Sequence, residues 1–118
     1  MCVMTDCLFC RIVAGEIPAT VVSDSDDVMA FRDINPKAPE HILVIPKAHF
    51  DTAAAMATVD PLLAGKVVAE AGAIAEKLGF AADGYRLMFN TGANGGQEVL
   101  HAHLHILGGR PLGPMLAT

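Results

Sequence analysis

The sequence has no tryptophan, and aromatic residues make up only 5% of its 118 residues. The side chains of valine, isoleucine, leucine and alanine must therefore fill the core. No apolar run comes near the roughly 18 residues that cross a bilayer, and no basic segment precedes a long apolar stretch at the N-terminus, so we expect neither a membrane helix nor a signal peptide. Cysteine is also scarce, and three residues are a poor basis for a disulfide framework. We therefore expect a reducing, cytoplasmic location.

Positive charge is scarce as well, because 8 Lys and Arg residues stand against 13 Asp and Glu residues and give a net charge of −5 with histidine neutral. A negative surface disfavours loose binding to nucleic acid, which depends on Lys and Arg contacts to phosphate. A small phosphorylated ligand is still compatible, since a local pocket can override the net charge. With 53% hydrophobic residues, the length suits a single globular domain over residues 1–118.

The hydrophobic pattern predicts an α+β fold. A short amphipathic helix or turn is expected over 7–14, and a long helix begins at Asp60 and Pro61 and ends at Gly79. The expected strands lie at 20–23, 28–34, 41–45, 85–90 and 100–107, with a glycine-rich loop over 91–96. This order favours an antiparallel sheet. One long helix cannot cover both faces of the sheet, so a partner subunit or the chain ends must cover the other.

Three of the five histidines alternate with apolar residues at 101–105. In a strand, alternate side chains point the same way, so His101, His103 and His105 are expected on one face, roughly 6.5–7 Å apart. Three buried imidazoles with no function would leave many polar atoms that need hydrogen-bond partners. A metal site is one interpretation, and phosphate chemistry with a neutral imidazole as nucleophile is the other. The loop at 94–97 favours phosphate, because glycines let backbone N–H groups approach an anion.

The N-terminal segment holds a second pattern, in which Cys7 and Cys10 are separated by two residues. This spacing suits one tetrahedral metal ion, but it supplies only half of the ligands. Two buried thiols that pack as small hydrophobic groups are the alternative. A redox pair is disfavoured because no βαβ pattern follows. The remaining cysteine, Cys2, is expected in a mobile tail.

The chain resembles the histidine-triad (HIT) superfamily, and within it the Hint branch of nucleoside phosphoramidate hydrolases. The resemblance is carried by 101–107 and by further segments at 16–19, 30–34, 41–47, 84–86, 95–97 and 107–111. It implies a homodimer whose subunits each add a five-stranded antiparallel sheet, with one long and one short helix, to a ten-stranded sheet. It also implies hydrolysis of adenosine phosphoramidates or aminoacyl adenylates through a covalent nucleotidyl-histidine.

The resemblance implies roles for individual residues. His103 would be the nucleophile, His105 would contact the phosphate and help with proton transfer, and His101 would orient the nucleophile. His41 matches a further histidine that lies near the triad. The nucleotide-binding residues would be Phe9, Phe31 and Ile34 at the base, Asp33 at the ribose, Asn90 at the phosphate or ribose, and Gly96, Gln97 and Glu98 beside the phosphate and leaving group.

Some members of the superfamily are similar to Cys-Cys-His-His zinc proteins. The matching positions in this sequence are Cys7, Cys10, His49 and His101. Such a zinc ion would anchor the N-terminal segment as a structural element. No organic cofactor, nucleic-acid partner or membrane partner is expected.

Three other functions remain open. A dinucleoside polyphosphate hydrolase is the nearest enzymatic alternative, but that branch usually has Gln where this chain has His105. A nucleotide-binding regulatory protein with little catalysis would have no need of a nucleophile, so the intact histidine pattern disfavours it. A hydrolase with all three histidines on one metal ion would lose activity directly on chelation.

Overall fold

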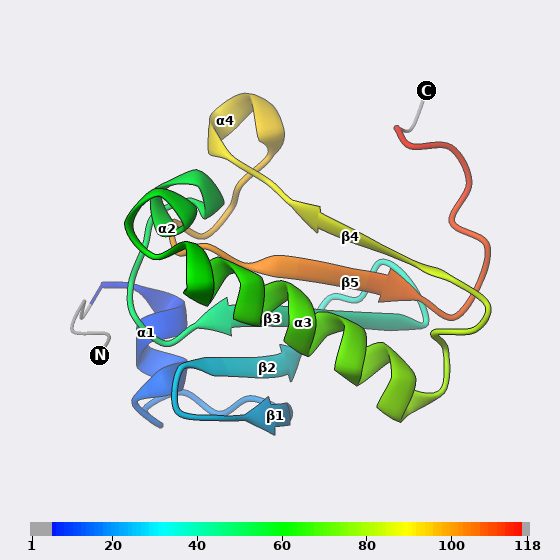
Figure 1. The fold of residues 1–118 in the computed structure, drawn as a ribbon, viewed down its shortest axis with the longest axis horizontal. Helices are drawn as coiled ribbons and strands as arrows, with labels where there is room; N and C mark the ends of the chain where they lie inside the picture. The colour runs from blue at the N-terminus through cyan, green and yellow to red at the C-terminus, as the bar shows by residue number, and fades with distance from the viewer. Residues whose placement is uncertain (1–5, 117–118) are drawn as a thin grey trace.

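The structure, a computed structural model, describes residues 6–116. One antiparallel sheet has the strand order β1-β2-β3-β5-β4, and helix α3 lies across one of its faces (Figure 1). The strands are β1 (Val21–Asp24), β2 (Val28–Arg32), β3 (Glu40–Pro46), β4 (Tyr85–Phe89) and β5 (Leu104–Gly108). The helices are α1 (Leu8–Val13), α2 (Ala53–Val59), α3 (Pro61–Leu78) and α4 (Gly92–Gly95). The predicted α+β fold with five antiparallel strands is confirmed, and Cys2 lies outside the described residues.

Helix α3 has the boundaries that its sequence predicts. The carboxylate of Asp60 accepts a hydrogen bond from the backbone N–H of Leu63 at 3.1 Å, and Pro61 occupies the first turn. Gly79 ends the helix in the left-handed conformation, with φ of 86°. The buried residues of the helix recur at spacings of three and four: Leu63, Val67, Ala71, Ile74 and Ala75. They pack on the sheet and form the main core.

The two faces of the sheet follow from the alternation of side chains along each strand. In β3, Ile42 and Val44 pack in the core beneath α3, whereas Leu43 and Ile45 face the opposite side. There they contact a smaller core that includes residues of α1. We expected either a partner subunit or the ends of the chain to cover this second face. The N-terminal end of the chain covers part of it. All residues from His41 to Pro46 are buried, as a central strand predicts.

Three elements differ from the prediction. The strand expected over 100–107 begins only at Leu104, because the N–H of Ala102 donates to the carbonyl of Phe50 at 2.7 Å and not to a neighbouring strand. Helix α2 was not expected; the hydroxyl of Thr52 caps it by accepting from the N–H of Ala55. The loop at 91–96 contains the single turn α4. Among residues 6–116, no helix is both long and apolar enough to cross a membrane.

Candidate functional site

Two adjoining cavities open on the sheet face that α3 does not cover. One has a volume of about 190 Å³ and the other about 260 Å³. Both are lined by His103 and His105, together with the carboxylates Asp33 and Glu98. A larger cavity of about 580 Å³ lies at the start of β4 beside the C-terminal segment, and none of the five histidines lines it. The chemistry-bearing side chains therefore gather at the junction of the two smaller cavities.

Most of the residues that line the smaller of these two cavities, which we call the polar cavity, have polar or charged side chains. Its further lining residues come from the loop before β3, from β3 itself, from β4 and the turn after it, and from β5: Lys37, His41, Met88, Asn90, Gly96 and Leu107. The larger one is mainly apolar and is walled by α1, the segment after it, and β2 and β3 with the turn between them. Its lining includes Leu8, Phe9, Ile12, Ile17, Phe31, Ile34 and Leu43. An apolar and a polar compartment that share two imidazoles fit a ligand with a flat hydrophobic end and a charged end.

The hydrogen bonds of His103 determine which of its ring nitrogens carries the proton. Its Nδ1 lies 2.7 Å from the carbonyl oxygen of His101, and a carbonyl can only accept. Nδ1 therefore carries the hydrogen, and Nε2 has a free lone pair. His103 is buried, and its ring packs against the ring of His105 with centroids 5.0 Å apart. A neutral imidazole with an available Nε2 is the form that can act as a nucleophile or base.

His105 is oriented by a chain of donors that begins at the backbone of Lys37. The N–H of Lys37 donates to Nδ1 of His41 at 3.1 Å, which leaves the hydrogen of His41 on Nε2. Nε2 of His41 lies 2.8 Å from Nδ1 of His105 and donates to it. The hydrogen of His105 is consequently on Nε2. Among residues 6–116, this Nε2 is a buried nitrogen without a hydrogen-bond partner, so it is a donor available to a bound anion.

Burial favours the neutral form of His105 and His41. Burial, together with smaller effects of the nearby His103 and His41, lowers the pKa of His105 to about 4, because a buried imidazolium loses its hydration and neighbouring positive charges repel it. The carboxylate of Asp33 acts in the opposite direction on His105, but its effect is smaller. Burial also lowers the pKa of His41, although Asp33 lies 3.5 Å from its Nε2. At neutral pH the imidazole of His105 is therefore uncharged.

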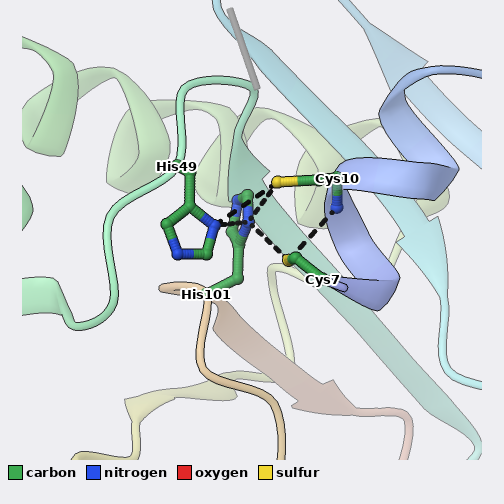
Figure 2. A group of neighbouring side chains, drawn as sticks. All are labelled: Cys7, Cys10, His49 and His101. Atoms are coloured by element: carbon green, nitrogen blue, oxygen red, sulfur yellow. Dashed lines mark hydrogen bonds between the residues drawn. The ribbon is translucent and has the colours of Figure 1, made fainter. Parts of the chain in front are cut away.

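Beside the cavities, two cysteines and two histidines form a compact cluster (Figure 2). Cys7 and Cys10 come from the start of α1, His49 from the loop after β3, and His101 from the segment before β5. Nδ1 of His101 lies 3.3 Å from Sγ of Cys7, 3.6 Å from Sγ of Cys10 and 3.2 Å from Nδ1 of His49. Sγ of Cys10 lies 3.4 Å from Nδ1 of His49. Four donor atoms thus point at one centre.

The donor geometry fits a tetrahedral zinc ion. With Zn–S near 2.3 Å and Zn–N near 2.05 Å, the S···N edges of a tetrahedron are about 3.5 Å and the N···N edge about 3.3 Å. The observed separations of 3.2–3.6 Å match these edges. Burial lowers the pKa of His101 to about 4, which keeps this imidazole in the neutral form that a metal ligand requires.

The partners of the two histidines add a second argument for a cation. Nε2 of His101 donates to the carbonyl of Pro46 at 2.8 Å, and Nε2 of His49 lies 2.9 Å from the carboxylate of Asp51. When both rings are neutral, as metal ligands must be, both hydrogens are on Nε2 and the two Nδ1 lone pairs face each other at 3.2 Å. Two lone pairs cannot form a hydrogen bond with each other. A metal ion between them would turn this repulsion into coordination, with Pro46 and Asp51 orienting the ligands.

The residues expected at the nucleotide lie in three places. Phe9, Phe31 and Ile34 line the apolar cavity, with Ile34 on its rim at 89% exposed. The polar cavity is lined by Asn90 and Gly96, and the junction by Asp33 and Glu98. Gln97 lines neither: its amide NH₂ donates to the carbonyls of Asp51 and Val99, and its amide oxygen accepts from the N–H of Gly92. Gln97 thus braces the surrounding loops.

The imidazole of His101 is likewise not in the cavities. It is fully buried in the Cys/His cluster, and only its carbonyl reaches His103. The expectation of three imidazoles side by side in one cleft therefore holds for His103 and His105 but not for His101. Sequence reasoning did not find Lys37 or Met88. Lys37 lies in the loop between β2 and β3 and acts through its backbone N–H, which donates to His41. No periodic pattern in the sequence indicates such a residue.

The chain is similar to known proteins over nearly its whole length. Residues 14–112 match the HIT domain family. The purine nucleoside phosphoramidase of Escherichia coli (strain K12) is 50% identical over 110 residues, which cover 93% of this chain and 92% of that protein. The structure of a histidine triad protein from Clostridium difficile has a TM-score of 0.92 at 42% identity and covers 97% of this chain and 99% of its own. A HIT family hydrolase from Clostridium thermocellum has a TM-score of 0.92 at 38% identity, with coverage of 98% and 100%.

Proposed function

The chain belongs to the HIT domain family, and from this premise we propose that it is a nucleotide-binding hydrolase that cleaves the P–N bond of purine nucleoside phosphoramidates. The observation that carries the proposal is the pair of His103 and His105, whose hydrogen bonds leave a lone pair on one Nε2 and a hydrogen on the other. The purine nucleoside phosphoramidase from E. coli, which shares half of the aligned residues, supports the substrate class. Aminoacyl adenylates belong to the same proposal, because the same attack on phosphorus would break the P–O bond that joins their adenylyl group to a carboxylate and would release the amino acid.

The proposed reaction has two displacements at phosphorus. Nε2 of His103 attacks the phosphorus atom, a P–N bond to the imidazole forms, and the bond to the leaving nitrogen breaks as that nitrogen takes the proton from Nε2 of His105 and departs as an amine. A water molecule then attacks the same phosphorus and returns a proton to Nε2 of His105. This second step breaks the bond between phosphorus and His103, releases the nucleoside monophosphate and returns His103 to its neutral form. The hydrogen bond from Nδ1 of His103 to the carbonyl of His101 stabilises the ring as positive charge develops during attack.

His105 is the proposed donor to the phosphoryl group. Its Nε2–H is buried at the junction of the cavities, and it can bind a phosphoryl oxygen or give a proton to the leaving amine. His41 acts through His105, since its Nε2–H keeps the hydrogen of His105 on the nitrogen that faces the ligand. The base would occupy the apolar cavity beside Phe9 and Phe31, and the carboxylate of Asp33 would accept the ribose hydroxyls.

The proposal is tested with the variant His103→Ala. Removal of a covalent nucleophile lowers kcat by roughly 10⁴-fold or more, so turnover of an adenosine phosphoramidate should fall to background. Binding of AMP, measured by calorimetry, should persist because most of the cavity wall is unchanged. Leu100→Ala is the matched control, since Leu100 is exposed and lines neither cavity. Retained turnover in His103→Ala would overturn the mechanism, and AMP binding without turnover by the wild type would favour a regulatory protein.

We also propose that Cys7, Cys10, His49 and His101 bind one structural zinc ion. The ion would fix α1 to the loop after β3 and to the segment before β5, without contact to phosphorus. The tetrahedral donor distances and the two opposed lone pairs support this site. Metal analysis of protein purified with a reductant should give one zinc per chain, and Cys7→Ser should lose it. Cys2→Ser is the control that should retain the metal, and a metal-free wild type would contradict the site.

Finally, we propose that residues 1–118 form one domain and that two copies form a homodimer through β4. This strand is at the edge of the sheet, so its outer backbone groups are available for pairing. Apolar side chains are exposed beside it, Tyr85 on the strand and Val68 on α3. Pairing of two β4 strands would produce a sheet of ten strands. The buried free thiol of Cys7 suits a reducing compartment, which supports a cytoplasmic location.

A further inference from the structure

The Cys/His cluster and the nucleophile are neighbours with three physical connections. We propose that the cluster positions His103 and the wall of the apolar cavity, so that metal occupancy raises the affinity of the protein for a nucleoside monophosphate. In this account Phe9 is a positioning residue that carries the effect from the metal ligands to the imidazole. The inference rests on the proposed zinc site and gives that site a function beyond anchoring the N-terminal segment.

The first connection is the ring of Phe9. Phe9 lies between Cys7 and Cys10 in the first turn of α1 and is 4% exposed. Its ring meets the ring of His103 edge-on, with centroids 5.0 Å apart and an interplanar angle of 85°. It also contacts His101 at 5.9 Å and Phe31 at 5.4 Å between centroids. A displacement of α1 therefore moves a group that packs directly on the nucleophile.

The second connection runs through the backbone of His101. The imidazole of this residue belongs to the cluster, while its carbonyl oxygen accepts the Nδ1–H of His103 at 2.7 Å. Only one residue, Ala102, separates the two histidines in the chain. Fixing the ring of His101 therefore fixes the acceptor that keeps the lone pair of His103 on Nε2.

The third connection is the wall of the apolar cavity. Leu8, Phe9 and Ile12 of α1 line this cavity. Helix α1 has six residues, a length at which an isolated helix is not stable in water, so tertiary contacts must hold it in place. Two of those contacts are the sulfur atoms of the cluster. In the metal-free protein the opposed lone pairs of His49 and His101 repel, so the cluster relaxes and α1 loses part of its anchor.

Coupling between two sites is reciprocal, and this gives the proposal a sharp test. If the metal raises the affinity for a nucleotide, the nucleotide raises the affinity for the metal by the same factor. Coupling energies between sites typically correspond to factors of about 5–150. We expect AMP to bind the metal-loaded protein at least about 5-fold more tightly than the metal-free protein.

The experiment uses Co²⁺ as a spectroscopic probe in the full-length protein under reducing conditions. Metal is removed with a chelator, and circular dichroism establishes that the metal-free protein remains folded. Co²⁺ bound by two thiolates and two imidazoles gives visible absorption bands that report on ligand geometry. AMP should shift these bands with the same midpoint that calorimetry gives for AMP binding, and the Kd for AMP should be higher without metal.

Two variants separate positioning from simple packing. Phe9→Leu keeps an apolar side chain in α1 but removes the ring that contacts His103, so it should retain the Co²⁺ bands while the effect of metal on AMP affinity shrinks. It should also lower kcat, because the nucleophile is less well held. Leu8→Ala is the matched control: Leu8 lines the same cavity, so this variant should weaken AMP binding equally with and without metal.

Each outcome supports or overturns the proposal. Equal AMP affinity in the folded metal-free and metal-loaded proteins overturns the coupling while the zinc site stands. Absence of thiolate Co²⁺ bands overturns both the zinc site and the coupling, and leaves the proposed hydrolysis untouched. If the metal-free protein unfolds, the proposal is tested by the metal-loaded Phe9→Leu variant alone. A kcat and an AMP affinity equal to those of the metal-loaded wild type would overturn the proposal.

Discussion

Hydrogen bonds to the backbone and between rings determine which nitrogen of each imidazole at the cavities carries the hydrogen. The carbonyl of His101 holds a hydrogen on Nδ1 of His103, and the N–H of Lys37 sets the hydrogen of His41 on Nε2. His41 in turn sets the hydrogen of His105. The proposed attacking atom and the proposed donor to the phosphoryl group are therefore arranged before a ligand arrives. Such preorganisation removes a reorganisation cost from the transition state.

The depressed pKa of His105 predicts that the protein loses stability in acid. Its pKa is about 4 in the folded protein and about 6.5 in an unfolded chain. As the pH falls from about 6.5 to about 4, the unfolded state binds a proton that the folded state does not, so the free energy of unfolding decreases. The groups that face His105 are His103, His41, Asp33 and Lys37.

Urea denaturation at a series of pH values measures this effect in the wild type and in His105→Gln. The variant should lose less stability between pH 6.5 and pH 4, because one of the groups that takes up a proton on unfolding is gone. The remaining slope includes the contributions of His41 and His101, whose pKa values are also lowered by burial. Parallel curves for the two proteins would show that His105 is not the group responsible.

Glu98 is expected to influence the leaving group. Its carboxylate is exposed and lines both cavities beside His103 and His105. A negative charge there attracts a protonated amine and repels a polyphosphate. Glu98→Ser should lower kcat/KM for a lysyl leaving group relative to a polyphosphate leaving group. Glu76→Ser, on the exposed side of α3, is the control. If the ratio of kcat/KM for the two leaving groups is unchanged in Glu98→Ser, Glu98 does not influence the choice of leaving group.

Local signals at the ends of α3 set the boundaries of this element. Asp60→Ala removes the side-chain acceptor for the N–H of Leu63, and the loss of such a cap typically costs about 1 kcal/mol. The free energy of unfolding from urea titration should fall by that amount. Asp60→Ser retains an acceptor oxygen and should recover most of the loss. A fully stable Asp60→Ala protein would mean that packing alone determines where the helix begins.

The same contrast between local and distant causes explains what the sequence could predict. The cap at Asp60, the left-handed Gly79 and the continuous apolar run of β3 are local, and each appears where it was expected. The predicted start of β5 was wrong because contacts with residues far away in the sequence determine where this strand begins. Ala102 bonds to the carbonyl of Phe50, and the ring of His101 is held by Pro46 and the cysteines.

The candidate site shows the same limit. Its histidines stand out in the sequence, and the pairing of Leu43 and Met88 with His105 brings β3 and β4 beside β5. That Gln97 braces loops, and that Lys37 contributes a backbone N–H, depends on contacts between segments far apart in the chain. No pattern within one segment encodes these contacts.

At the scale of the whole molecule, an incomplete sheet predicts self-association. Val68 lies one helical turn before Gly72, where an added Cβ would sit 3.6 Å from the hydroxyl of Tyr85 on β4. This face of α3 therefore adjoins the open edge of the sheet. Val68→Glu should convert a dimer to a monomer, because it buries a charge in the apolar part of the interface.

Sedimentation or light scattering measures this change. Val21→Glu is the matched control, because Val21 is 48% exposed and Val68 46%, and Val21 lies on the opposite edge strand β1. The wild type and Val21→Glu should both have twice the mass of a single chain. A monomeric wild type, or a dimeric Val68→Glu, would rule out pairing through this face.

The account as a whole depends on a covalent bond between His103 and phosphorus. The most direct test is mass spectrometry of protein that is mixed with an adenosine phosphoramidate and denatured within the time of one turnover. The account predicts a mass increase of one adenylyl group, located on His103 by peptide fragmentation and absent from His103→Ala. An adduct on any other residue, or turnover by the wild type without an adduct, would contradict it.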